Sequence, residues 1–200
     1  MSASPPTCFL LASLLVLTSG CGSSDKREFQ QALNLDERVA EEFAKFIASQ
    51  GHAAGKVIVV THPDVGPRIQ ESQTRRLRGF RKGFGDANVV EVPVAAPRDD
   101  RLVMVQNDYV PSGLLREAVA AHPGATAVIS LVGFPHEDPV GPFPVPLYLF
   151  GLSHQQVAQQ ALDGGWALAA LYSRGASDTP PRKPAPISPE VLDSYTLEVR

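Results

Sequence analysis

The chain has few of the residues that cross-link a small fold or bind a metal ion. Its 200 residues include two cysteines, two methionines and one tryptophan, and aromatic residues make up 7% of the total. Two cysteines, Cys8 and Cys21, cannot provide a disulfide framework or a four-cysteine zinc site. The fold must therefore be stabilised by burial of apolar side chains, for which a hydrophobic content of 44% over this length is sufficient.

An excess of one charge is also missing. Lysine and arginine together number 18, aspartate and glutamate number 21, and the formal net charge is −3. A balance this even does not indicate an electrostatic partner such as nucleic acid. We therefore expect no nucleic-acid partner, and any function must depend on local motifs.

The N-terminal region has the pattern of a secretion signal. Residues 9–19, FLLASLLVLTS, form an apolar run too short to span a bilayer comfortably, and small residues and Cys21 follow it. The segment Leu17–Cys21, LTSGC, resembles the lipobox of bacterial lipoproteins, in which the cysteine is lipidated and becomes the first mature residue. Met1–Thr7 lacks the Lys or Arg of an ordinary signal, and the alternative interpretation is a plain secretory segment with an incidental cysteine.

The lipobox interpretation divides the chain into four parts. It predicts export to the cell envelope and attachment to a membrane through lipid on Cys21 rather than through a spanning helix. The parts are a signal peptide at 1–20, the lipidated cysteine and a polar tether at 21–34, an α/β domain at 35–174, and a proline-rich tail at 175–200 that contains an edge strand near Ser194–Val199.

Within the domain, the stretch Val145–Arg174 predicts a complete strand, helix and strand. Two short apolar runs, Pro146–Leu152 and Trp166–Tyr172, are typical of strands buried on both faces. Between them, Ser153 can cap a helix that Gly164 and Gly165 end. A parallel crossover is the expected product.

The same reasoning predicts the other elements. A capping box at Asn34 and Glu37 predicts a helix from about Leu35 to Ser49. Further strands are predicted at Lys56–Thr61, Asn88–Val94 and Ala125–Val132, with helices at Pro67–Phe84 and near Leu114–Val119. Together these elements predict a three-layer αβα sandwich around a mostly parallel sheet of about five strands.

The helix at Pro67–Phe84 contains a basic run, Arg75, Arg76, Arg78, Arg81 and Lys82. Guanidinium groups suit phosphate or an anionic membrane surface, but Leu77, Phe80 and Phe84 mark the buried face. We therefore predict a solvated helix face. Gly79 and Gly83 predict a close approach of this helix to the sheet.

No catalytic, cofactor or metal site is predicted. His62, His136 and His154 follow strands, with Asp64, Glu137 and Asp138 nearby, but no HxxxH or HExxH spacing supports a metal site. Ser153 is interpreted as a helix cap, because FGLSH lacks the glycines of a nucleophile elbow. Neither a G-x-G-x-x-G motif nor a P-loop lysine is present.

An ordered set of motifs resembles one lobe of the type I periplasmic sugar-binding proteins, which share their fold with the ligand domains of LacI-type repressors. The resemblance covers about residues 36–174, and each motif occurs in the family's order. The motifs are KVIVVTHP, RRLRGFRKGF, NVVEV, HPGATAVIS, PLYLFGLS and LDGGWALAALYS. The resemblance implies a strand order of 2-1-3-4-5.

The resemblance also implies ligand-binding positions at the carboxyl ends of the strands. Arg76 matches the family's arginine, whereas Ser153 stands where the family has an aspartate and Ser173 where glutamine is usual. His62 follows the first strand at the same edge. The candidate ligand-binding residues are therefore Arg76, His62, Ser153 and Ser173.

The expected function is non-enzymatic binding in the cell envelope. The ligand is either a small polar molecule or an envelope protein, because much of the family's polar set is replaced. Two alternatives remain open at this point: a hydrolase-type enzyme that uses His62 or His154, and a purely structural envelope protein.

Overall fold

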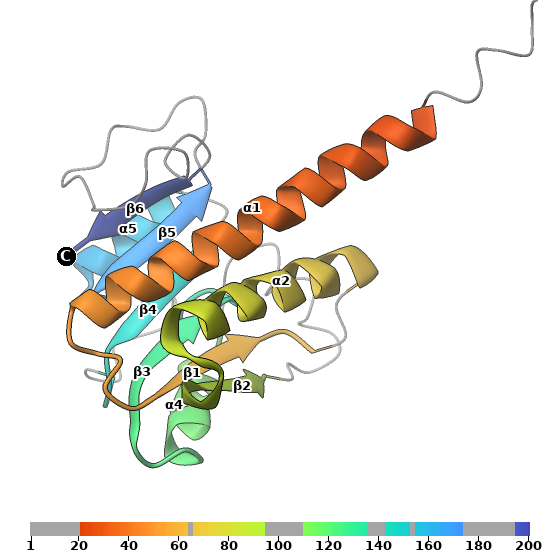
Figure 1. Cartoon of the computed structure of the whole chain (residues 1–200). Helices are drawn as coiled ribbons and strands as arrows, with labels where there is room; N and C mark the ends of the chain where they lie inside the picture. The colour runs from red at the N-terminus through yellow and green to blue at the C-terminus, as the bar shows by residue number, and fades with distance from the viewer. Residues whose placement is uncertain (1–20, 64–65, 95–109, 136–142, 153–154, 174–194) are drawn as a thin grey trace, which may run out of the picture.

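The protein is built around one six-stranded sheet (Figure 1). The computed structural model describes residues 21–63, 66–94, 110–135, 143–152, 155–173 and 195–200, with side chains from residue 25 onward. The strand order is β2-β1-β3-β4-β5-β6. The strands are β1 (Lys56–Thr61), β2 (Val89–Pro93), β3 (Ala125–Ser130), β4 (Leu147–Leu152), β5 (Ala169–Ser173) and β6 (Tyr195–Val199).

All neighbouring strands are parallel except β5 and β6, which are antiparallel. The order predicted for the first five strands is confirmed, and so is the edge strand predicted near the C-terminus. β1 occupies the range predicted from its β-branched run, and Pro93 lies at the end of edge strand β2, where a missing amide is tolerated.

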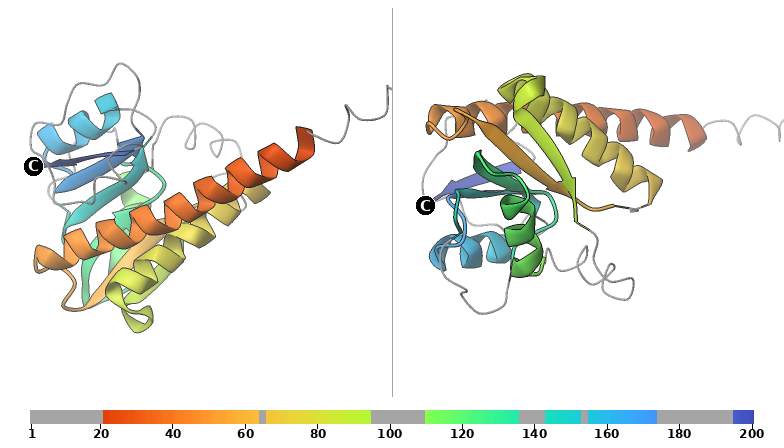
Figure 2. Two further views of the ribbon diagram at one scale, coloured as in Figure 1. Left: turned by 45° about the horizontal axis from the view of Figure 1, so that its top comes forward. Right: turned by 90° about the horizontal axis from the view of Figure 1, so that it is seen from below.

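Helices cover both faces of the sheet. α1 (Cys21–Ser49) and α2 (Pro67–Phe84) lie on one face, and α4 (Ser112–Ala120) and α5 (Gln155–Asp163) lie on the other, as the right-hand view of Figure 2 shows. A short 3-10 helix, η1 (Asp86–Asn88), links α2 to β2. The predicted three-layer αβα architecture is therefore confirmed.

Each face of the sheet carries its own hydrophobic core. Phe43 of α1, Phe80 of α2 and Phe150 of β4 are buried together under the first helix pair, with ring centroids 5.1 to 5.5 Å apart at the Phe150 ring. Leu115 and Tyr172 belong to the core on the opposite face. Edge-to-face and tilted ring contacts of this kind add to the energy of apolar burial.

The prediction that the first helix starts near Leu35 is wrong. α1 begins at Cys21, so the segment expected to be a polar tether is helical. Residues 25–32 are exposed apart from Phe29, and Leu33 is the first buried side chain. The N-terminal part of α1 consequently extends beyond the body of the domain (Figure 1).

α1 and α2 run parallel and in close contact. Phe29 contacts Arg68, and further along the pair Ala40 lies against Gly79 and Ala44 against Gly83. The predicted close approach at the two glycines is correct, but its partner is α1 and not the sheet. A Cβ at Gly83 would lie 2.3 Å from the Cβ of Ala44, so only glycine permits this separation.

Candidate functional site

Three of the four residues predicted to bind a ligand, those that the structure describes, lie at the carboxyl edge of the sheet. His62 directly follows β1, and Ser173 is the last residue of β5. Arg76 reaches this edge from α2, where its guanidinium lies beside Gly151 in β4. Ser153 and His154 lie outside the described residues. The structure therefore brings Arg76 and Ser173 to the same edge of the sheet, as parallel strands require.

Arg76 is held by a carboxylate of α1. Its Nε and Nη2 donate to Oδ1 of Asp36 at 3.2 and 3.1 Å. The two side chains are 19% and 10% exposed. A charge-assisted pair this far from solvent is stronger than a surface ion pair, because water screens it less. Asp36 thus fixes the orientation of the guanidinium.

Two hydroxyl groups complete the coordination of Asp36. Ser72 of α2 donates to Oδ2 at 2.6 Å, and Tyr195 of β6 donates to Oδ1 at 3.1 Å. Burial, together with the charge of Asp36, raises the pKa of Tyr195 to about 12. One carboxylate therefore ties α1 to α2 and to β6 at the carboxyl edge.

An aromatic ring supports the guanidinium from the sheet side. The guanidinium carbon of Arg76 lies 5.4 Å from the ring centroid of Phe150, a cation–π distance. Gly151 next to it has φ of 75°, and a Cβ there would lie 2.9 Å from Nη1 of Arg76. Glycine at 151 therefore both permits the bulge in β4 and leaves room for Arg76.

The other predicted residues are less closely connected. Ser173 is exposed and pairs through the β5–β6 ladder with Tyr195, which places it next to the Asp36 cluster. His62 is half-buried, and burial lowers its pKa. It has no hydrogen-bond partner among the described residues.

Sequence reasoning missed Asp36, Ser72 and Tyr195 as members of this cluster. Tyr195 lies 159 residues from Asp36 in sequence, and no local motif links them. The capping pattern assigned to Asn34 and Glu37 gives Asp36 no role, and the tertiary contacts of Asp36 follow only from the fold.

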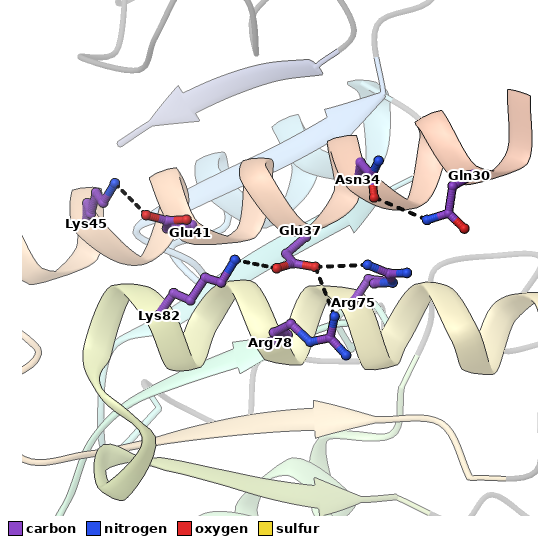
Figure 3. A network of polar contacts seen from close by, with 8 residues as sticks. All are labelled: Gln30, Asn34, Glu37, Glu41, Lys45, Arg75, Arg78 and Lys82. Atoms are coloured by element: carbon purple, nitrogen blue, oxygen red, sulfur yellow. Dashed lines mark hydrogen bonds and ion pairs between the residues drawn. The ribbon is translucent and has the colours of Figure 1, made fainter. Parts of the chain in front are cut away.

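The basic run of α2 forms a second polar cluster with Glu37 (Figure 3). Arg75 and Arg78 lie 3.3 and 3.6 Å from Oε2 of Glu37, and Lys82 lies 2.5 Å from Oε1. The hydrogen bond from Lys82 is the main cause that lowers the pKa of Glu37. The predicted solvated face is therefore wrong for Arg75 and Arg76, which are half-buried against α1.

The described ranges contain neither a metal cluster nor a helix that could span a membrane. These ranges hold no group of three or more His, Cys, Asp or Glu side chains arranged around a common metal position. His136, Asp64, Glu137 and Asp138 lie outside them. None of the described helices combines the length and the apolar character needed to span a bilayer.

Comparisons with known proteins find likeness in structure only. No protein-family model and no curated protein sequence matches the chain. Solved structures with a similar arrangement include an ABC-transporter solute-binding protein from Burkholderia graminis in complex with D-arabinose, with 16% identity, a TM-score of 0.47, and coverage of 68% of this chain and 47% of that one.

Two further solved structures are sugar-binding proteins. AraP, an arabinose-binding protein from Geobacillus stearothermophilus, is 15% identical with a TM-score of 0.41, covering 68% of this chain and 45% of its own. A sugar-binding protein from Bacillus halodurans is 16% identical with a TM-score of 0.43, and the coverages are the same. The chain thus spans about half the length of the structures that it matches.

Proposed function

We propose that this chain is a lipid-anchored protein of the cell envelope that binds a small polar ligand without catalysis. The binding site is the carboxyl edge of the sheet around Arg76. The observation that carries the proposal is the guanidinium of Arg76, which Asp36 fixes on one side while Phe150 supports it at 5.4 Å.

This arrangement suits a ligand with hydroxyl groups. Arginine donates in a fixed planar geometry, and Asp36 and Tyr195 add acceptor and donor groups within hydrogen-bond distance of one another. Because the guanidinium is already oriented, a ligand does not have to order it on binding. Ser173 and His62 extend the same edge on either side.

A second candidate function is docking of an envelope protein at the same edge. Its support is that Asp36 already binds both Nε and Nη2 of Arg76 as well as two hydroxyl groups. Because these groups are already paired with one another, a protein could add contacts over a larger area around them than a small ligand can.

The proposed anchor agrees with the position of Cys21 at the start of α1. The helix between Cys21 and Leu33 is about 18 Å long, at about 1.5 Å per residue. A lipid on Cys21 would therefore hold the lobe away from the membrane on a helix rather than on a flexible linker.

Ligand binding is tested by calorimetry and thermal shift with a panel of pentoses and hexoses. We expect at least one sugar to raise the melting temperature of the wild-type chain. Arg76→Lys keeps the charge but loses the planar guanidinium and its paired N–H donors, so it should reduce that rise strongly. If no sugar binds and cross-linking in intact cells captures one envelope protein through Ser173, docking of that protein replaces ligand binding as the function of this edge.

The anchor is tested by palmitate labelling in bacterial cells. Wild-type chain should incorporate label and sediment with membranes, and Cys21→Ala should lose both properties. Equal labelling of the two chains would exclude Cys21 as the lipidation site.

A further inference from the structure

α2 carries a large excess of positive charge in a chain whose net charge is negative. Its one acidic residue is Glu71, whereas the whole chain has a formal charge of −3. The cationic residues of the helix are Arg68, Arg75, Arg76, Arg78, Arg81 and Lys82. This one helix of 18 residues thus carries six of the 18 Lys and Arg residues of the chain.

Carboxylates of α1 neutralise this charge only in part. Asp36 pairs with Arg76, and the single carboxylate of Glu37 is shared among Arg75, Arg78 and Lys82. Arg81 has no ion-pair partner within the described residues. Positive charge therefore remains available on the outward side of α2.

The remaining charge surrounds a hollow in the surface. A volume of about 370 Å³ is lined by Thr74, Arg78, Arg81, Lys82 and Asp86. The first four recur at near-helical spacing along α2, and Asp86 follows from η1. The side chains of Arg78 and Lys82 are 54% and 53% exposed, so their charged groups are accessible to a ligand.

We propose that this hollow binds a small phosphomonoester that also carries hydroxyl groups. Two guanidinium groups and one ammonium match the charge and geometry of a phosphoryl group. The hollow lies within the range of small-molecule sites, about 300–1,000 Å³, and has room for an organic body as well as the phosphate. Asp86, which lines the same hollow, repels phosphate but can accept hydrogen bonds from hydroxyl groups, so the phosphoryl group is expected beside Arg78, Arg81 and Lys82 and the hydroxyl groups beside Asp86.

This site is separate from the carboxyl edge around Arg76 and does not depend on the function proposed there. A phosphoryl group could also come from a membrane lipid. The parallel packing of the helices places Lys82 beside Glu37 and Gly83 beside Ala44, about 30 Å along α1 from Cys21. This distance separates the hollow from a membrane that holds Cys21, and we therefore choose a soluble ligand over a lipid headgroup. Only this choice between the two sources rests on the proposed anchor.

Isothermal titration calorimetry of the full chain at low salt tests the proposal with glucose 6-phosphate, glycerol 3-phosphate and adenosine monophosphate as probes. At least one should bind with a Kd below about 1 mM, and inorganic phosphate should bind at least about tenfold more weakly. Arg81→Gln should weaken binding by about tenfold or more, because it removes a charge-assisted contact from an exposed position. Arg27→Gln, an exposed change of equal charge on α1, should leave the Kd unchanged.

Several results would overturn the proposal. Absence of binding by all three probes would do so, as would an equal loss of affinity in Arg81→Gln and Arg27→Gln. Binding to vesicles that contain an anionic phospholipid, lost in Arg81→Gln while the soluble probes give no heat, would assign the hollow to a membrane headgroup instead. The sugar response that depends on Arg76 should be unaffected by Arg81→Gln, so failure of one site is distinguishable from failure of the other.

Discussion

Gly79 of α2 lies directly against the backbone of Glu37 in α1. A Cβ at position 79 would lie 2.2 Å from the carbonyl oxygen of Glu37 and 2.8 Å from the Cβ of Ala40. Backbone atoms cannot move aside as a flexible side chain can, so the separation of the two helices depends on this glycine. That separation in turn brings Asp36 and Glu37 within reach of the cations of α2.

Gly79→Ala should therefore destabilise the protein although alanine favours helix. The expected loss is about 2 kcal/mol, because the overpacking penalty exceeds the gain in helix propensity. Chemical denaturation monitored by circular dichroism measures it. The matched control is Gly113→Ala in α4, where no atom lies within 4 Å of the added Cβ and stability should stay equal or rise slightly.

Asp36→Asn should lower the free energy of unfolding by about 2 kcal/mol. It leaves the guanidinium of Arg76 partly buried without its counter-charge, although the amide oxygen can still accept from Tyr195 when it takes the place of Oδ1. A double-mutant cycle with Arg76→Gln should show strong coupling between the two positions. Strictly additive losses would contradict a direct pair, and Glu28→Gln at an exposed position of α1 should have almost no effect.

The contribution of Glu37 to stability should depend on pH. Hydrogen bonding to Lys82 lowers the pKa of Glu37 below its ordinary 4.5, so the folded state favours the charged form. Its contribution is complete above pH 4.5 and is lost as the pH falls through the lower pKa of the folded state.

At neutral pH, Glu37→Gln should therefore cost about 1 kcal/mol, and in acid the variant and the wild type should converge. Urea titrations at several pH values measure the difference. Glu42→Gln, which loses an exposed pair with Lys45, should show little effect at any pH. A loss for Glu37→Gln that stays constant in acid would contradict the ion-pair explanation.

Ionisation of Tyr148, which is buried, and of Tyr195, which is half-buried, should weaken the fold at high pH. Burial raises the pKa of Tyr148 and of Tyr195 to about 12 from an ordinary 10.0. Between these values the unfolded chain releases protons that the folded chain retains, so stability is complete below pH 10 and falls as the pH rises toward 12.

Each tyrosine should contribute a slope of up to about 1.4 kcal/mol per pH unit in that range. Denaturation across alkaline pH should therefore show a shallower decline in the Tyr148→Phe and Tyr195→Phe variants than in the wild type. Tyr148→Phe also removes the hydrogen bond to Nδ1 of His52, which should lower stability at neutral pH. An unchanged alkaline slope in both variants would refute the assignment.

Much of the fold could be predicted because its signals are local. The β-branched run at Lys56–Thr61 and the helix at Pro67–Phe84, which opens with proline, match the observed bounds. The start of α1 could not be placed in this way. Asn34 and Glu37 form a capping pattern in sequence, but Asn34 accepts from Gln30 inside the helix and Glu37 binds the cations of α2.

The candidate site was predictable only where a residue could be aligned with a known pattern. Arg76 was predicted in this way, but its partners come from α1, α2 and β6, and their positions follow from tertiary packing. The same limit explains the error at Gly79 and Gly83. Two glycines spaced by four residues indicate a close approach, and the sequence does not say which element approaches.

The parallel course of α1 and α2 has a mechanical consequence for a chain held at its N-terminus. A pulling force applied at Cys21 along α1 would slide that helix past α2 in shear. Such a movement would have to break several contacts at the same time rather than one after another. These contacts are the ion pairs of Asp36 and Glu37 and the close helix packing at Gly79 and Gly83. The contact between α1 and α2 therefore resists a force directed along α1.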